Sequence, residues 1–186
     1  MTEISSQHAA VDRYIAGVFA ASPEKKPCCT IGCFACCSEP VYASEAEVIH
    51  ILEYLTPEQI AEVKIKLVDW LAKTKPLMDQ NMPGAVAYRQ LKAPCVLLKN
   101  GLCSVYPRRP YGCRAWFAFQ NPGNCDLPYR EHQGYAQFSN KIFEVLNGLV
   151  FINGKHIIDH LGILLAEKLL GRKRPSGSRL TDTRND

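Results

Sequence analysis

The stretch CCTIGCFACC, residues 28–37, places five cysteines within ten positions, and two of them, Cys36 and Cys37, are adjacent. Cys33 and Cys36 are separated by two residues. That gap lets both sulfurs point at one metal ion, because thiolates must converge to about 2.3 Å from zinc. The segment shows neither helical nor strand periodicity, so residues 23–43 are predicted to form a loop. A loop can fold its backbone around an ion, and the stretch therefore indicates sulfur chemistry.

The chain is long enough to fold without sulfur cross-links. It has 186 residues, of which 47% are hydrophobic and 22% charged, and this composition is typical of one globular domain with its own core. The sequence lacks a basic start followed by an apolar run, and it contains no run of 18 apolar residues. We therefore expect a cytoplasmic protein without a membrane span. In a reducing compartment, an odd count of nine cysteines indicates metal binding or redox chemistry rather than disulfides.

A second group of cysteines begins 58 positions after Cys37 and consists of Cys95, Cys103, Cys113 and Cys125. Asn100–Gly101 stands between two apolar runs, which is the strongest short-range signal for a two-residue β-hairpin. Such a hairpin would bring its two cysteines near each other at one end of the strands. We expect Cys33 and Cys36 to share one site with these sulfurs and with Cys113, so that metal binding ties distant parts of the chain together.

The adjacent pair Cys36–Cys37 is poorly placed for a mutual disulfide. Neighbouring Cα atoms are about 3.8 Å apart, below the usual range for a disulfide. In an extended chain the two side chains would also point to opposite sides. Either the backbone turns sharply here, or the two sulfurs serve different partners: two metals, a metal and the core, or a metal and a substrate.

Three arginines accompany the second cysteine group: Arg108, Arg109 and Arg114. A site with four thiolates carries excess negative charge, so nearby guanidinium groups would lower the pKa of the thiols and donate hydrogen bonds to sulfur. Arg109 and Arg114 are therefore candidates for supporting a bound cofactor. The alternative for Arg114 is an ion pair with a carboxylate.

The apolar periodicity predicts a mainly α fold, an irregular helical domain with one small β-hairpin and a cysteine-rich loop region. Helices are expected over residues 6–21, 44–55, 56–76, 131–149 and roughly 155–170. Capping boxes at Ser44–Glu47 and Thr56–Gln59 open the second and third of these, and Gly171 ends the last. The stretch VFINGKHII between the last two helices is alternatively a second hairpin.

Histidines supply a weaker set of metal candidates. His156 and His160 are four positions apart on an expected helix, so they share a face and are able to bind zinc. The alternative is that both are core or surface histidines without a metal. His50 is also expected to be a core or surface histidine.

Net charge is +4, and the last sixteen residues, GRKRPSGSRLTDTRND, carry five basic and two acidic side chains. The rest of the chain is thus close to neutral, which argues against a nucleic-acid surface on the fold. The end of the chain is polar and rich in turn residues. We therefore expect a single metal-binding domain over residues 1–171, followed by a disordered basic tail over residues 172–186.

Taken together, the motifs resemble the CxxCxxCC cysteine-cluster family of the YkgJ type, whose members are described as zinc- or iron-chelating. The resemblance rests on CFACC at residues 33–37, on Cys95, and on GLCSVYP and RPYGCR between residues 101 and 114. It covers about residues 28–125. The family usually has two residues between its first and second cysteines, whereas Cys29 and Cys33 are separated by three, and Phe34 stands where the family has glycine. Either Cys29 binds through a wider loop or Cys28 takes its place, with Cys28 the expected spare thiol.

The resemblance implies a metal site and no settled reaction. The candidate ligands are Cys29, Cys33, Cys36, Cys37, Cys95, Cys103, Cys113 and Cys125. More than four clustered cysteines exceed the needs of one structural zinc, which favours an iron–sulfur cluster of the 4Fe–4S type over zinc.

One branch of the family resembles the flagellin lysine N-methylases, but this chain is shorter and has no glycine loop for a methyl donor. An iron–sulfur-dependent methyltransferase-like enzyme and a metal-free thiol redox protein are therefore the alternatives. The expected partner is a metal ion or cluster. A protein partner or substrate is left open.

Overall fold

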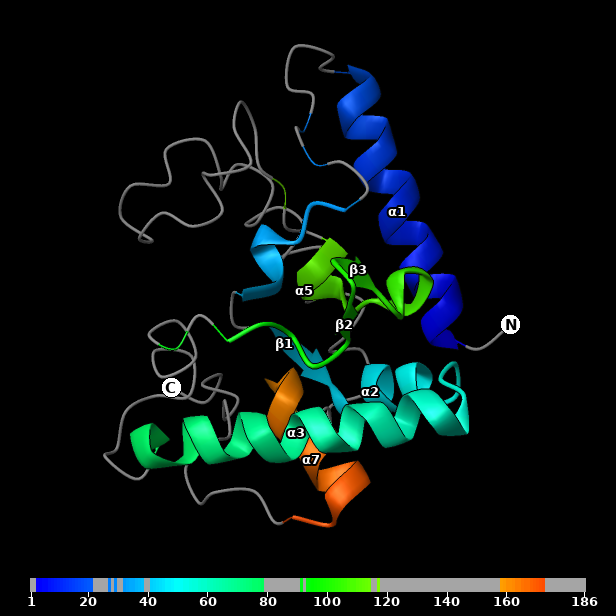
Figure 1. Ribbon diagram of the computed structural model, residues 1–186. Coiled ribbons are helices and arrows are strands. Elements are labelled where there is room, and N and C mark those ends of the chain that lie inside the picture. The colour runs from blue at the N-terminus through cyan, green and yellow to red at the C-terminus, as the bar shows by residue number, and fades with distance from the viewer. Residues whose placement is uncertain are drawn as a thin grey trace, which may run out of the picture.

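The computed structural model describes residues 3–21, 27, 29, 32–38, 41–78, 91, 93–114, 117 and 158–172. As predicted, the fold is mainly α. Helix α3 (Pro57–Met78) crosses one side of the molecule, and α7 (Leu161–Leu170) packs against both α3 and α2 (Glu45–Leu52) (Figure 1). Helix α1 (Glu3–Ala21) rises away from this layer, and the green segment of residues 93–114, which carries three of the described cysteines, lies between α1 and α3 (Figure 1).

Both predicted capping boxes are confirmed. The Ser44 hydroxyl accepts a hydrogen bond from the backbone N–H of Glu47 at 3.2 Å, and the Glu47 carboxylate accepts from the Ser44 N–H at 2.7 Å. Thr56 and Gln59 make the same reciprocal pair at the start of α3, at 3.3 and 2.9 Å. These side chains satisfy backbone donors that a helix start otherwise leaves open.

Several helix bounds differ from the sequence-based ranges. Helix α1 begins at Glu3 rather than residue 6, and α2 ends at Leu52 rather than residue 55. Helix α3 continues through Pro76 to Met78. A proline this close to the end removes one backbone hydrogen bond of the last turn, so the helix tolerates it there better than in its middle.

The predicted hairpin is confirmed. Strand β2 (Leu98–Lys99) pairs antiparallel with β3 (Leu102–Cys103), and Leu98 stands opposite Cys103. Asn100 has φ of 52° and Gly101 of 75°. Positive φ at both central residues is the requirement of the two-residue hairpin turn that matches the twist of the strands.

A second antiparallel pair corrects two predictions. Strand β1 (Tyr42–Ser44) lies in the region expected to be a loop, as does the 3₁₀ turn η2 (Ala35–Ser38). Strand β4 (Ile158–His160) occupies the start of the expected last helix and pairs with β1, with Tyr42 opposite His160. Helix α7 thus begins at Leu161, and the His160 Nδ1 accepts from the Gly162 N–H at 3.1 Å. Partners so distant in sequence leave no local pattern that could have predicted the pairing.

The hydrophobic core lies where α2, α3 and α7 meet. Its fully buried members include Val48, Ile51, Leu67, Leu164 and Leu165. A smaller cluster joins α1 to the cysteine region, with the buried residues Val11, Ile15 and Tyr111. None of the described helices combines the length and apolar character needed to cross a lipid bilayer.

Some predictions fall on residues outside the described ranges. These are the helix expected over 131–149, the tail beyond Arg172, and the positions of Cys28, Cys125 and His156.

Candidate metal centre

The adjacent cysteines lie on η2, where the backbone turns sharply. The N–H of Cys37 donates to the carbonyl oxygen of Phe34 at 2.8 Å, which closes the turn. A 3₁₀ turn has 3.0 residues per turn, so neighbouring side chains diverge by about 120° rather than pointing to opposite sides. Cys36 is a free thiol that donates a hydrogen bond to Cys37. The pair is therefore not a disulfide, and the sharp turn is the first of the two alternatives considered for it.

A backbone hydrogen bond joins the two cysteine groups. The N–H of Cys95 donates to the carbonyl oxygen of Cys37 at 2.8 Å, and the Cys95 carbonyl in turn accepts from Leu98 at 2.9 Å. Amide groups also face the sulfurs, because Leu97 donates to the thiol of Cys95 and Val105 to that of Cys103. Such N–H···S bonds stabilise a thiolate and are a regular feature of cysteine metal sites.

Cys113 is placed by the short helix α5 (Tyr111–Arg114). The Cys113 N–H donates to the carbonyl of Pro110 at 3.0 Å, and the Tyr111 N–H donates to Oε1 of Glu47 at 2.7 Å. Glu47 is thus both the capping residue of α2 and the acceptor at the start of α5. One buried carboxylate ties the cysteine-bearing turn to the core helices.

Four sulfurs from three chain segments lie close enough to affect one another's titration. We call Cys36, Cys95, Cys103 and Cys113 the thiol cluster. The charge of Cys36 acts on each of the other three, and Cys113 also responds to Cys95 and Cys103.

Every member of the thiol cluster has a raised pKa. Burial, followed by neighbouring sulfurs, raises the pKa of Cys95 to about 11 and that of Cys113 well above its ordinary value, and burial also raises the pKa of Cys103. The hydrogen bond to Cys37, followed by burial, raises the pKa of Cys36. The cluster is thus protonated at neutral pH, and a metal that binds it must displace protons.

Arg109 supplies positive charge to the thiol cluster. Its guanidinium lowers the pKa of Cys36, Cys103 and Cys113, against the larger effects that raise them. The group lies over the ring of Tyr106, 4.0 Å from the centroid. Its buried Nε has no hydrogen-bond partner among the described residues. A buried donor left open beside protonated thiols fits an anionic thiolate–metal centre, because the bound centre would supply the missing negative charge.

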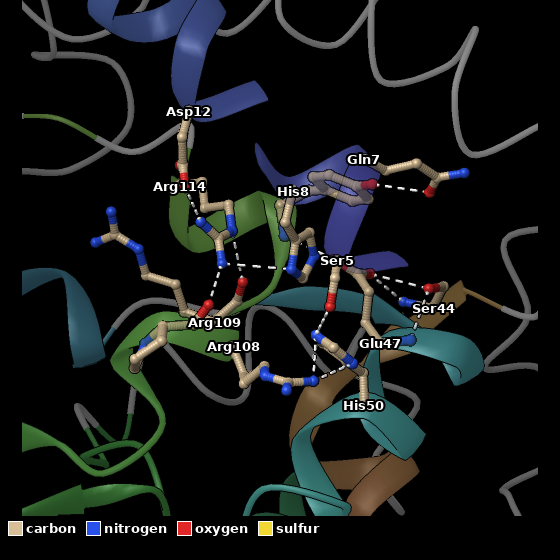
Figure 2. A network of polar contacts seen from close by, with 12 residues as sticks. Ser5, Gln7, His8, Asp12, Ser44, Glu47, His50, Arg108, Arg109 and Arg114 are labelled. Atoms are coloured by element: carbon tan, nitrogen blue, oxygen red, sulfur yellow. Dashed lines mark hydrogen bonds and ion pairs between the residues drawn. The ribbon is translucent and has the colours of Figure 1, made fainter. Parts of the chain in front are cut away.

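Arg114 faces the other way, toward α1. Its Nη1 pairs with the Asp12 carboxylate at 2.5 Å, and its Nη2 and Nε donate to the carbonyls of Pro107 at 2.7 Å and Arg109 at 2.9 Å (Figure 2). Three protein acceptors thus use the donors of this guanidinium. The carboxylate pair, the alternative considered from the sequence, is therefore the arrangement that forms.

Two of the remaining cysteine candidates differ in exposure, and others lie outside the described residues. Cys29 is exposed, and Cys33 is half-buried. Cys28 and Cys125 are not described. Within the described part of the chain, no three His, Cys, Asp or Glu side chains already stand in metal-ligating positions. Ligation therefore requires the thiol cluster to close further around the metal.

Histidines take roles that spacing did not predict. His50 is a core histidine, 3% exposed, and His8, which no sequence pattern singled out, is equally buried. His160 stacks on Trp70 with ring centroids 5.2 Å apart, and burial lowers its pKa to about 4. The contact between His50 and Arg108 joins positions 58 apart, so no local pattern could have predicted it.

Comparison with known proteins identifies the family. Residues 27–130 match the family model CxxCxxCC, which is described as "Putative zinc- or iron-chelating domain". No curated protein and no solved structure matches the chain. The matched range spans more than half of the 186 residues and includes all nine cysteines. The chain therefore belongs to the CxxCxxCC family, whose described property is the chelation of zinc or iron.

Proposed function

We propose that this protein holds a metal centre, an iron–sulfur cluster or zinc, through its clustered cysteines. The observation that carries the proposal is the thiol cluster, whose sulfurs come from η2, from Cys95 just before the hairpin, from the hairpin and from α5. The charge of Arg109 acts on three of them. Thiolate donors select zinc and iron–sulfur clusters over hard cations such as magnesium and calcium. The donor set thus agrees with the family's description.

The thiol cluster supplies the number of ligands that either centre needs. Four thiolates complete a tetrahedral zinc site or a cubane cluster. Cys29, Cys33, Cys37 and Cys125 remain as further proposed ligands. They would serve a second metal, or replace a member of the thiol cluster when the site closes.

An iron–sulfur cluster is favoured over zinc by the surroundings of the sulfurs. N–H donors face Cys95 and Cys103, and Arg109 keeps an open buried Nε. Hydrogen bonds and positive charge around the sulfurs set the reduction potential of such clusters. The surplus of cysteines beyond four points in the same direction.

The raised pKa values of the thiol cluster disfavour the alternative of a metal-free thiol redox protein. A redox-active or nucleophilic cysteine works as a thiolate and needs a lowered pKa. Cys36, Cys95, Cys103 and Cys113 all have raised values. Free thiols of this kind suit a reducing compartment, and we propose the cytoplasm as the location.

Metal analysis of protein purified without oxygen tests the proposal. About four iron and four sulfide per chain, with broad absorption near 400 nm, are expected for a cubane cluster. About one zinc per chain without colour would support the zinc form. A protein that carries neither metal after aerobic and anaerobic purification, and takes up neither on reconstitution, would contradict the metal centre altogether.

Cysteine variants test the ligand assignment. Cys36→Ser and Cys95→Ser should each lose most of the bound metal, because each removes one of four thiolates. Cys28→Ser is the matched control, since it makes the same chemical change at the expected spare thiol. Full metal content in both cluster variants, or equal loss in all three, would overturn the assignment.

A further inference from the structure

A cavity of about 180 Å³ lies on the side of α5 that faces α1 and α2. Its wall consists of Ser5, His8, Ala9 and Asp12 from α1, His50 from α2, and Pro107, Arg108 and Arg114 around α5. The space is large enough for several water molecules. It is below the size of pockets for drug-sized ligands, about 300 Å³ or more. The cavity therefore suits a small occupant.

The two guanidinium groups in the wall, those of Arg108 and Arg114, differ in how far their charge is balanced by protein groups. Arg114 donates from Nε, Nη1 and Nη2 to protein acceptors, and Asp12 balances its charge. Its Nη2 also lies 3.3 Å from Nδ1 of His8. Arg114 is thus a satisfied part of the wall, and it holds the imidazole of His8 in place.

Arg108 has only neutral partners among the described residues. Its Nη1 lies 2.6 Å from Nδ1 and 2.8 Å from Nε2 of His50 (Figure 2). Its guanidinium stands 5.7 Å from the ring centroid of Tyr54. Burial and the charge of Arg108 lower the pKa of His50, so this imidazole is neutral at pH 7. Glu53 acts on His50 from a distance and forms no ion pair with Arg108 within the described residues. A full positive charge therefore lines the cavity without a counter-charge.

His8 adds a buried imidazole to the wall. The residue is 3% exposed, and its Nε2 has no hydrogen-bond partner among the described residues. That nitrogen lies 3.5 Å from Oε1 of Glu47, which already accepts from Tyr111. His8 is thus held between Arg114 on Nδ1 and Glu47 on Nε2, which fixes the position of its imidazole in the wall.

We propose that this cavity binds a small oxyanion, a carboxylate or a phosphate, through the guanidinium of Arg108 with the imidazoles of His8 and His50 beside it. Planar guanidinium groups bind both oxyanions with paired N–H donors. Arg109, the next residue along the chain, acts on the thiol cluster instead. The oxyanion site and the thiol cluster thus use consecutive arginines, and the oxyanion site does not depend on the metal proposal.

Titration calorimetry on the full-length protein tests the site, with sodium phosphate and sodium acetate as separate probes and sodium chloride at matched ionic strength as the blank. Saturable one-to-one binding of either probe is expected, and the stronger probe identifies the oxyanion class. Arg108→Gln should weaken binding by about tenfold or more, because a charge-assisted hydrogen bond contributes about 1.5–3 kcal/mol. Arg13→Gln, which removes the same charge from an exposed position of α1, should leave binding unchanged.

A second variant separates binding from folding. Ala9→Leu places a larger side chain in the cavity wall and should abolish binding while Arg108 is kept. Ring proton signals of the histidines followed by NMR should shift with each bound probe in the wild type and not in Ala9→Leu. Wild-type protein that binds neither probe saturably, or Arg108→Gln and Arg13→Gln variants that lose affinity equally, would overturn the proposal.

Discussion

The backbone N–H of Cys95 donates a 2.8 Å hydrogen bond to the carbonyl oxygen of Cys37. This bond holds the two cysteine groups together without using any sulfur. The polypeptide itself therefore brings the segments of the thiol cluster together, and a metal bound at the proposed site would meet a partly assembled set of ligands.

Removing the metal should lower thermal stability but leave the helices intact. At a free metal concentration of about 1,000 times the dissociation constant, binding adds about 4 kcal/mol to the free energy of unfolding, which raises Tm of a chain of this size by about 8–16 °C. Far-UV circular dichroism of loaded and chelated protein measures both quantities. Chelator added to Cys36→Ser is the control and should have little effect. Equal Tm values for loaded and chelated wild type would contradict a contribution of the metal to folding.

Substitution of Glu47 should be among the most destabilising changes at a polar residue. Its carboxylate accepts from the Ser44 N–H at 2.7 Å, the Ser44 hydroxyl at 3.0 Å and the Tyr111 N–H at 2.7 Å. Glu47→Gln turns one of these oxygens into an N–H₂ group that faces donors, which should lower the free energy of unfolding by about 3 kcal/mol. Urea unfolding measures the change.

The second capping box is the matched control for that experiment. Gln59 plays the same part beside Thr56 but at an exposed helix start, where water replaces a lost partner. Gln59→Ala should therefore cost only about 0.5–1 kcal/mol. A loss of equal size in the two variants would show that the link from Glu47 to α5 contributes nothing.

Two glycines should respond to alanine in opposite directions. A Cβ at Gly162 would lie 3.0 Å from the ring of Trp70, so Gly162→Ala overpacks the core and should destabilise by about 1–3 kcal/mol. Gly17 lies within α1 with open space around it, and Gly17→Ala should stabilise by about 0.5–1 kcal/mol. Urea midpoints of both variants test the close packing of α7 on α3. Stabilisation by both alanines would contradict that packing.

Burial of His160 predicts a loss of stability in weak acid. Its pKa falls from 6.5 to about 4 on folding, so between these values the unfolded chain binds more protons than the folded chain. The contribution of neutral His160 is complete above about pH 6.5 and is lost as pH falls toward 4, by about 2 kcal/mol between pH 7 and pH 4.5.

His160→Asn isolates this effect. Asparagine keeps an acceptor for the Gly162 N–H, so the start of α7 retains its cap. The free energy of unfolding of the variant should change less between pH 7 and pH 4.5 than that of the wild type. An unchanged pH dependence would assign the acid sensitivity to other groups.

The features that the sequence predicted correctly are those stabilised by interactions between residues only a few positions apart. Ser44 and Glu47, Thr56 and Gln59, and the Asn100–Gly101 turn each satisfy their own backbone neighbours, so spacing alone identified them. Gly171 ends α7 with φ of 65° for the same local reason.

What the sequence could not predict depends on contacts between distant segments. Strand β4 (Ile158–His160) replaced that part of an expected helix, because backbone partners on β1 outweighed the helical pattern around His160. Arg114 forms an ion pair with Asp12 instead of contacting the thiols, and this depends on where α1, which carries Asp12, packs. Family motifs identified the cysteines as a set, but only the fold shows which four affect one another's pKa and that the charge of Arg109 acts on three of these.

The pairing of β1 with β4 also bears on the order of events in a newly made chain. It closes the layer of α2, α3 and α7 through backbone hydrogen bonds and apolar burial, with no sulfur in its register. We therefore expect this layer to form whether or not metal is present. A chain made while metal is scarce should then be folded and unloaded, and should take up metal afterwards at the proposed cysteine site.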